Sequence, residues 1–318
     1  MTATAEQYLE VCKPKVVALI VFTAIVGMLM AVPGVPPLAT TLWATLGIGL
    51  AAASGAAVNH LIDRREDAIM ARTRHRPLPS GHLSSRKVLI FATLLGVAGV
   101  GLLVAFVNLL TAVLTFVAMI GYAIIYTVFL KRATPQNIVI GGAAGAAPPL
   151  LGWAAIQGQL DPPAYLLFLI IFAWTPPHFW ALAIYRRHDY AAVNIPMLPV
   201  THGVSFTRWH ILFYTLILFL ITLLPYLIGM SGLFYLGGAV VLGVVFLVYS
   251  ARLLGSDEEW LAMRVFSYSI IYLIVLFAFL LVDHYLPLPH PLHDTAPALL
   301  DFAAEPRSWA RDIQGSLP

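Results

Sequence analysis

Six long stretches without Asp, Glu, Lys or Arg take up most of this 318-residue chain and leave it few ways to fold. A membrane-spanning helix needs about 20 predominantly apolar residues, so the three longest stretches have room for two spans each. Breakers at Pro33–Pro37, Asn108 and Gly229–Gly232 divide those three stretches. The chain is therefore predicted to be an all-α integral membrane protein with nine transmembrane helices. The six stretches are Val16–Ile62, Val88–Leu130, Ala133–Leu160, Pro162–Tyr185, Trp209–Ala251 and Val265–Val282.

Composition and charge placement agree with a membrane protein. Only 10% of the residues are charged, against about 25% in a soluble domain, which is typical of a chain solvated mostly by lipid. With nine spans, all 18 Lys and Arg residues except Arg307 and Arg311 fall on the side of the N-terminus. The positive-inside rule places that side in the cytoplasm and the C-terminus on the opposite side. The net charge of +3 therefore reflects loop topology, and no nucleic-acid partner is expected.

The two ends of the chain are expected to differ. Residues 1–287 are predicted to form one transmembrane domain, and residues 288–318 a Pro- and Ala-rich tail that is loosely ordered and non-cytoplasmic. The first 15 residues lack the features of a transit peptide or a signal-peptide cleavage site, so the first span is expected to be retained. The lone Cys12 excludes a disulfide framework or a Cys-based metal cluster within one chain.

A charged segment directly follows the second predicted span. Asn59, Asp63 and Asp67 are spaced by four residues, which on one continuous helix places their side-chain oxygens on a single stripe. Hard oxygen donors of this kind suit Mg²⁺, which binds a few carboxylates together with water and phosphate oxygens. Arg72 and Arg76 follow, and guanidinium groups bind phosphate oxygens as planar forks. The segment therefore predicts a site for Mg²⁺ and a diphosphate.

A basic pair ends the fourth predicted span, where Tyr126 is followed by Lys131 and Arg132. One interpretation is an aromatic and basic anchor at the membrane interface. The other is that Lys131 and Arg132 supply a second pair of phosphate contacts. The residues alone favour neither.

Two proline pairs interrupt the fifth and sixth spans. Pro148-Pro149 is expected to bend the fifth, and Pro176-Pro177 to break the sixth before its end. His178, Tyr185 and Asp189 follow at spacings of seven and four, which places them on one helix face. Polar groups at membrane depth are functional candidates, because burying them in lipid is costly.

These motifs resemble a known family. Asn59, Asp63 and Asp67, followed by the R-P-L-P-S-G run at Arg76–Gly81, are similar to the UbiA superfamily of intramembrane prenyltransferases. Within that superfamily the chain resembles the haem-farnesylating branch, and the resemblance covers about residues 10–285. The segments that carry this closer similarity are Tyr126–Thr127, Leu130–Asn137, Trp174–Ala183, Asp189–Tyr190 and Ile195–Pro199.

The resemblance implies a fold, a reaction and a set of roles. Nine helices would surround a central cavity, with Mg²⁺ and farnesyl diphosphate near the cytoplasmic ends of the second and sixth spans. Farnesyl diphosphate would ionise, a vinyl group of haem b would attack the farnesyl cation, and water would complete haem O. The implied catalytic residues and metal ligands are Asn59, Asp63, Asp67 and Asp189. The implied substrate-binding residues are Arg72, Arg76, Tyr126, Lys131, Arg132, His178, Trp180 and Tyr185.

Two departures from the wider superfamily stand out. Aromatic prenyltransferases usually carry three Asp residues where this chain has His178, Tyr185 and Asp189, and the spacing from Tyr126 to Lys131 is one residue longer here. A His beside Trp180 leads to the hypothesis that His178 faces the porphyrin, as an iron ligand or a propionate partner. The alternative is a His that is hydrogen-bonded within a broken helix end.

Three other functions are compatible with parts of the sequence. A prenyltransferase for an aromatic acid or quinone precursor would share the first motif but not the His-Tyr-Asp pattern. A haem or anion carrier would be expected to show repeated halves and polar groups near the midplane. A non-catalytic oxidase assembly factor would not need the stripe of Asn59, Asp63 and Asp67, which is called the acid stripe below. The resemblance also implies the inner membrane of a bacterium, with a haem A-forming enzyme or terminal oxidase assembly as downstream partner.

Overall fold

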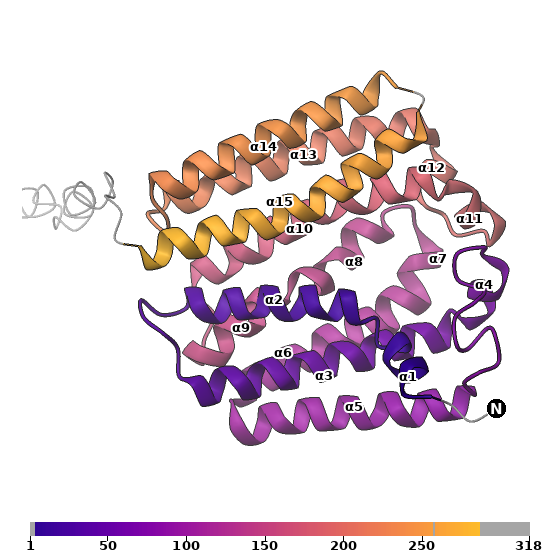
Figure 1. Cartoon of the computed structure of the whole chain (residues 1–318), viewed down its shortest axis with the longest axis horizontal. Coiled ribbons are helices and arrows are strands. Elements are labelled where there is room, and N and C mark those ends of the chain that lie inside the picture. Colours follow the sequence, from indigo (N-terminus) through magenta and orange to yellow (C-terminus); the bar gives the residue numbers. More distant parts are fainter. Residues whose placement is uncertain (1–3, 257, 287–318) are drawn as a thin grey trace, which may run out of the picture.

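The computed structural model describes residues 4–256 and 258–286, and the regular elements of these residues are all helices (Figure 1). One of them, η1, is a π-helix, which runs directly on from α6. In chain order the helices are α1 (Ala5–Val11), α2 (Pro14–Met30), α3 (Leu38–Ile62), α4 (Arg64–Ile69), α5 (Ser85–Phe106), α6 (Leu109–Ile120), η1 (Gly121–Leu130), α7 (Lys131–Ala133), α8 (Asn137–Ala146), α9 (Pro148–Gln157), α10 (Pro162–Tyr185), α11 (Arg187–Ala192), α12 (Leu198–Thr201), α13 (Gly203–Leu227), α14 (Leu233–Leu254) and α15 (Glu259–Tyr285).

The prediction of nine spans is confirmed within the described residues. Eight helical segments are long and apolar enough to cross a membrane, and α1 with α2, bent by 57°, makes a ninth if the pair is counted as one span. The predicted division at Asn108 is also correct, because this residue caps α6 by accepting a hydrogen bond from the Thr111 amide at 2.8 Å. The protein is an integral membrane protein. The predicted tail, residues 288–318, lies outside the described residues.

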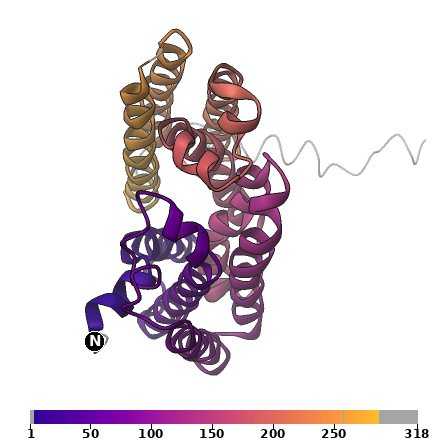
Figure 2. The ribbon, with the colours of Figure 1, turned by 90° about the vertical axis from the view of Figure 1, so that its right-hand side faces the viewer.

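The spans form a closed ring of helices. From α2 to α15, each span contacts the next one along the chain, and α15 returns to contact α2. The two halves of the chain lie on opposite sides of this ring (Figure 2). Inside it, α9 contacts α2, α3, α6 and α10, so the end of the ring around α9 is filled by protein.

The opposite end of the ring carries the charged segments. The helices α1, α4, α7 and α11 gather there, at the right of Figure 1. The outer faces of the spans are apolar instead; on α5 and α6, for example, Val97 is 68% exposed and Val117 is 60% exposed. Exposed apolar side chains of this density are expected where the surrounding solvent is lipid.

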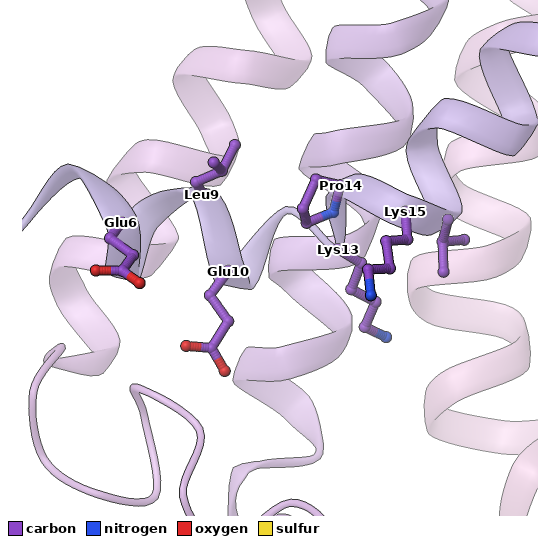
Figure 3. A pocket seen from close by; sticks show the side chains of 7 residues that line it. Glu6, Leu9, Glu10, Lys13, Pro14 and Lys15 are labelled. Atoms are coloured by element: carbon purple, nitrogen blue, oxygen red, sulfur yellow. The ribbon is translucent and has the colours of Figure 1, made fainter.

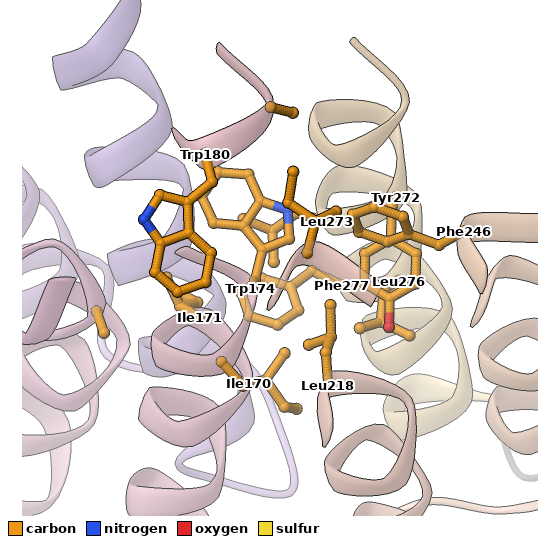
Figure 4. Packing of buried hydrophobic residues seen from close by; sticks show 14 of the residues in the cluster. Ile170, Ile171, Trp174, Trp180, Leu218, Phe246, Tyr272, Leu273, Leu276 and Phe277 are labelled. Atoms are coloured by element: carbon orange, nitrogen blue, oxygen red, sulfur yellow. The ribbon is translucent and has the colours of Figure 1, made fainter. Parts of the chain in front are cut away.

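The second half of the chain has an aromatic core between α10, α13, α14 and α15 (Figure 4). Trp180, Phe246, Tyr272 and Phe277 are among its fully buried side chains. The Trp174 indole in this core donates a hydrogen bond to the Ser269 carbonyl at 2.7 Å, whereas the buried Trp180 Nε1 has no hydrogen-bond partner among the described residues. Large aromatic side chains pack this half of the chain around α10.

The two proline pairs behave differently. As expected, the fifth span is interrupted: α8 ends at Ala146, and Pro148 and Pro149 begin α9. There they cost little, because the first amides of a helix have no partner within it. The prediction that Pro176-Pro177 break the sixth span is wrong, since α10 continues through both to Tyr185. Packing against α8, α13 and α15 keeps it helical despite the two missing donors.

Close packing between α2 and α9 gives a testable prediction of stability. A Cβ atom added to Gly152 would lie 1.9 Å from the Ala24 carbonyl oxygen, which is backbone and cannot turn aside. Gly152→Ala is therefore expected to destabilise the protein by about 1–3 kcal/mol, the usual cost of overpacking. Gly145→Ala in α8 is the matched control, because nothing lies within 4 Å of its Cβ position. Thermal unfolding of both variants in one detergent measures the difference, and equal melting temperatures would contradict the prediction.

Candidate active site

The predicted acid stripe lies at the charged end of α3. Asn59, Asp63 and Asp67 are buried, with exposed fractions of 4%, 3% and 4%. The expectation of one continuous helix is wrong, because α3 ends at Ile62 and α4 begins at Arg64. The four-residue spacing survives this bend, since the Asp63 amide donates to the Asn59 carbonyl at 2.9 Å and the Asp67 amide to the Asp63 carbonyl at 2.8 Å.

Each carboxylate of the stripe is paired with a cation from another segment. Asp63 Oδ2 accepts from Lys131 Nζ at 2.6 Å and from the Asn59 amide at 2.9 Å. Asp67 Oδ2 accepts from Arg76 Nη1 at 2.7 Å, because the loop after α4 folds back over the stripe. The structure thus brings the acid stripe and part of the predicted basic set into one buried network.

Arg132 extends this network toward the surface. Its Nη2 donates to Glu66 Oε1 at 2.6 Å and lies 3.8 Å from Asp63 Oδ1. Lys131 and Arg132 therefore face the acid stripe, whereas an interfacial anchor would place them toward lipid. Of the residues predicted from sequence, the network joins Asn59, Asp63, Asp67, Arg76, Lys131 and Arg132.

Lys13 belongs to the same network and was missed as a site residue from the sequence. Its Nζ donates to Asn59 Oδ1 at 2.5 Å and to the Tyr122 hydroxyl at 3.2 Å. Lys13 has a left-handed backbone, φ 51°, at the junction of α1 and α2. The sequence offers one signal, a lysine directly before Pro14, but the same pattern also fits a simple entry to the first span.

The π-helix η1 sets the geometry of the basic side of the network. Tyr122, Thr127 and Lys131 contact Lys13, Asn59 and Asp63 respectively. In an α-helix, the nine steps from Tyr122 to Lys131 make about two and a half turns, which would put these two residues on opposite faces.

The i→i+5 winding of a π-helix brings those residues to one face. The side chain of Thr127 follows the same register, since its hydroxyl donates to the Tyr122 carbonyl at 2.9 Å. This winding accommodates the extra residue noted between Tyr126 and Lys131. Tyr126 itself packs against Gly141, where an added Cβ would come within 2.2 Å of its ring.

The second predicted motif is not joined to the first by a contact between described residues. Asp189 lies 3.9 Å from Arg186 on its own segment, and the Arg186 guanidinium lies 4.9 Å from the centre of the Tyr185 ring. Arg72 makes no hydrogen bond or ion pair with the described residues. Burial raises the pKa of the Tyr190 phenol on α11.

His178 is held inside the helical core. Its Nδ1 is 2.6 Å from the Ser269 hydroxyl, and its ring stacks on Trp174 at 4.1 Å and Phe266 at 4.5 Å. Aromatic rings thus stack on the imidazole of His178 from both sides. Trp180 is fully buried and lies edge to face with Tyr214 at 5.3 Å.

The donor chemistry of the acid stripe fits Mg²⁺. Asn59, Asp63 and Asp67 offer hard oxygens, and the buried Asp63 Oδ1 has no hydrogen-bond partner among the described residues. No three Asp, Glu, His or Cys side chains of the described residues converge on a point that could hold a metal ion. The stripe is therefore a partial site, of the kind that phosphate oxygens and water complete.

A cavity of about 430 Å³ lies at the α1–α2 junction (Figure 3). It shares Lys13 with the buried network but none of the acid-stripe residues. The cavity is lined by Glu6, Leu9, Glu10, Lys13, Pro14, Lys15 and Val16.

Sequence comparison gives strong similarities over most of the chain. A profile of the UbiA prenyltransferase family matches residues 20–274. Relatives named protoheme IX farnesyltransferase, from Methylococcus capsulatus and Thioalkalivibrio sulfidiphilus, are each 62% identical to this chain. The first alignment covers 281 residues, 88% of this chain and 94% of the relative. The second covers 279 residues, 88% of this chain and 92% of the relative.

Solved structures show the same fold at low sequence identity. A structure described as digeranylgeranylglyceryl phosphate synthase has a TM-score of 0.74 and 20% identity, covering 88% of this chain and 98% of that one. A UbiA homologue from Archaeoglobus fulgidus, bound to GPP and Mg²⁺, has a TM-score of 0.59 and 15% identity, covering 86% of this chain and 99% of that one.

Proposed function

This chain belongs to the UbiA prenyltransferase family, and from that membership we propose that it transfers a farnesyl group from farnesyl diphosphate to haem b. The observation that carries the proposal is the buried network of the acid stripe with Lys131 and Arg76, in a chain 62% identical to relatives named for this activity. The network supplies what the leaving group of such a reaction needs, which is fixed positive charge in a site shielded from water.

The reaction balances with water as the third reactant. The C–O bond of farnesyl diphosphate breaks, and the diphosphate leaves with the bonding electrons. The terminal carbon of a haem vinyl group attacks the farnesyl cation, which forms a C–C bond and moves the positive charge to the carbon beside the porphyrin. Water adds there and loses a proton, giving the hydroxyethylfarnesyl group of haem O.

The roles follow from the contacts of the network. Lys131, Arg132, Arg76 and Arg72 bind and orient the diphosphate. The side chain of Lys131 is only 13% exposed, so the low local dielectric strengthens its interaction with the diphosphate. The acid stripe would hold Mg²⁺, which supplies charge neutralisation of the diphosphate when bound. Asp63 also holds Lys131 in place through the 2.6 Å contact. The same carboxylate therefore serves as a proposed metal ligand and as the partner of a diphosphate-binding lysine.

The second motif is proposed to serve the haem side of the reaction. Asp189 is the remaining carboxylate for a metal, and Tyr126, Tyr185 and Trp180 are proposed substrate contacts. The hydrogen bond between His178 Nδ1 and Ser269 would fix the orientation of the imidazole, as a supporting contact does for a ligating histidine. His178 is accordingly proposed as a haem-side residue, toward the iron or a propionate.

The proposed location is the inner membrane of a bacterium, with the charged end of the ring in the cytoplasm. Residues 1–287 are proposed as the membrane domain, with the C-terminal tail on the opposite side. Haem O is a precursor that other enzymes use, so a haem A-forming enzyme or a terminal oxidase under assembly is the proposed recipient.

The proposed reaction is tested with the full chain in detergent, haem b, farnesyl diphosphate and Mg²⁺, by mass analysis of the pigments. The expected product is a haem heavier by one farnesyl group and one water, and none should form after chelation of Mg²⁺. Prenylation of a hydroxybenzoate with no new haem would assign the chain to an aromatic or quinone-precursor acceptor. No product with either acceptor would contradict both assignments and favour a haem or anion carrier.

A further inference from the structure

His60 is a buried polar side chain that the proposed mechanism leaves without a role. It lies on α3 beside Asn59, with an exposed fraction of 2%. Both of its ring nitrogens are buried, and neither has a hydrogen-bond partner among the described residues. A neutral imidazole carries one donor and one acceptor, and buried groups of this kind are nearly always paired. His60 therefore stands out from Asn59, whose side chain contacts Lys13, Asp63 and Thr127.

The residues beside His60 indicate what kind of partner it can take. Lys13 is bonded to Asn59, the residue before His60, and Arg76 is bonded to Asp67. An imidazole N–H beside a site that gathers these cations suits an anionic oxygen acceptor, which the same cations attract.

Helix geometry shows which wall of the site His60 faces. Consecutive residues of an α-helix are turned by about 100°, so His60 does not share the face on which Asn59 meets η1. It shares a face with Ala57, three residues earlier. Ala57 packs with Val11, Leu78 and Leu83, so this face of α3 lies under the end of α1 and the loop that carries Arg72 and Arg76.

We propose that His60 donates a hydrogen bond to an oxygen of the diphosphate, and that it is a substrate-binding residue of the site. The inference deepens the proposed function and rests on it for the identity of the ligand. The diphosphate is then held between two walls. Lys131 and Arg132 form one wall, and His60 with the loop of Arg72 and Arg76 forms the other. A neutral N–H on the second wall adds a directional contact without adding charge.

The proposal is tested with His60→Leu and His60→Gln in the full chain, using inorganic pyrophosphate with Mg²⁺ as the probe. Calorimetry measures the affinity, and haem b binding is followed separately by absorbance. His60→Leu is expected to weaken pyrophosphate binding about 10- to 100-fold, as expected for one lost hydrogen bond to a charged group. His60→Gln keeps an N–H donor and should regain most of the affinity, and haem b affinity should not change in either variant.

A control in the same helix separates binding from packing. Ser54→Ala removes a buried hydroxyl that donates to the Ala92 carbonyl at 2.7 Å, away from the network. It should lower the melting temperature and leave pyrophosphate affinity unchanged. His60→Leu should keep or raise the melting temperature, because it replaces an unpaired buried polar group by an apolar one.

Three results would overturn the proposal. Equal pyrophosphate affinity in His60→Leu and the unaltered chain would remove the diphosphate contact. Weakened haem binding with unchanged pyrophosphate binding would assign the imidazole to a haem carboxylate instead. No pyrophosphate binding by the unaltered chain would also overturn it. Because the assay contains no haem acceptor, a failure to farnesylate haem would contradict only the proposed function.

Discussion

Asp63→Asn and Lys131→Met are each expected to lower the rate of farnesyl transfer about 10²- to 10³-fold, the usual cost of removing one preorganised electrostatic group. Asp63 is 3% exposed and its Oδ2 lies 2.6 Å from Lys131 Nζ, so both groups act in a site with little water. Lys131→Met removes a positive charge from the leaving-group side. Asp63→Asn removes the charge of the central oxygen donor and also frees Lys131 from its partner.

The double variant separates catalysis from structure. Each single change leaves one buried charge unpaired, which typically costs about 3–5 kcal/mol of stability. Combining them removes both charges, so the melting temperature should recover while the transfer rate stays low. A double variant that regains the rate together with its stability would show that the pair has only a structural role.

An exposed ion pair at the same end of the protein serves as control. Arg187 and Glu259 lie 2.6 Å apart with side chains 33% and 43% exposed. Exposed pairs contribute about 0–1 kcal/mol, so Glu259→Gln should change stability little and the transfer rate less than about twofold. Pigment mass analysis gives the rates, and thermal unfolding in one detergent gives the stabilities.

The sequence was sufficient to predict the spans and the chemical character of the charged end. Long charge-free stretches have one stable solution in lipid, which is a helix that satisfies its own backbone. The spacing of Asn59, Asp63 and Asp67 predicted that their side chains would share one side, and hydrogen bonds at the same spacing maintain this across the bend at Asp63. Spacing could not predict the break between α3 and α4, because a spacing of four residues fits one continuous helix equally well.

Other features of the site depend on contacts between distant segments. Lys13 meets Asn59 across 46 residues, and no local pattern encodes that contact. The two proline pairs look alike in sequence, yet only Pro148-Pro149 interrupts a helix, because packing against neighbouring helices keeps α10 helical through Pro176-Pro177. Sequence patterns report what a residue prefers, whereas these outcomes were decided by tertiary packing.

The winding of η1 gives the second large expected effect. Inserting one alanine after Ile124 lengthens η1 by one residue, which turns the residues that follow by up to about 100° around the helix axis. Thr127 and Lys131 would then leave the face that contacts Asn59 and Asp63. The transfer rate should fall at least as far as in Lys131→Met, about 10²- to 10³-fold, since a whole wall of the site moves.

Ile124→Ala is the matched control for this insertion, because the side chain is 41% exposed and the substitution keeps the helix length. It should change the rate less than about twofold, as is usual for an exposed position. An insertion variant that transfers farnesyl within a few-fold of the unaltered rate would show that the register of η1 does not place Lys131.

If the lengthened chain does not fold, Thr127→Val tests the same register without a change of length. It removes the hydroxyl that donates to the Tyr122 carbonyl at 2.9 Å and accepts from the Asn59 amide at 3.1 Å. Losing these two hydrogen bonds loosens Asn59 on the side of η1, so the rate should fall about tenfold, as for one to two net hydrogen bonds. An unchanged rate in Thr127→Val would mean that η1 is a packing irregularity with no part in setting the site.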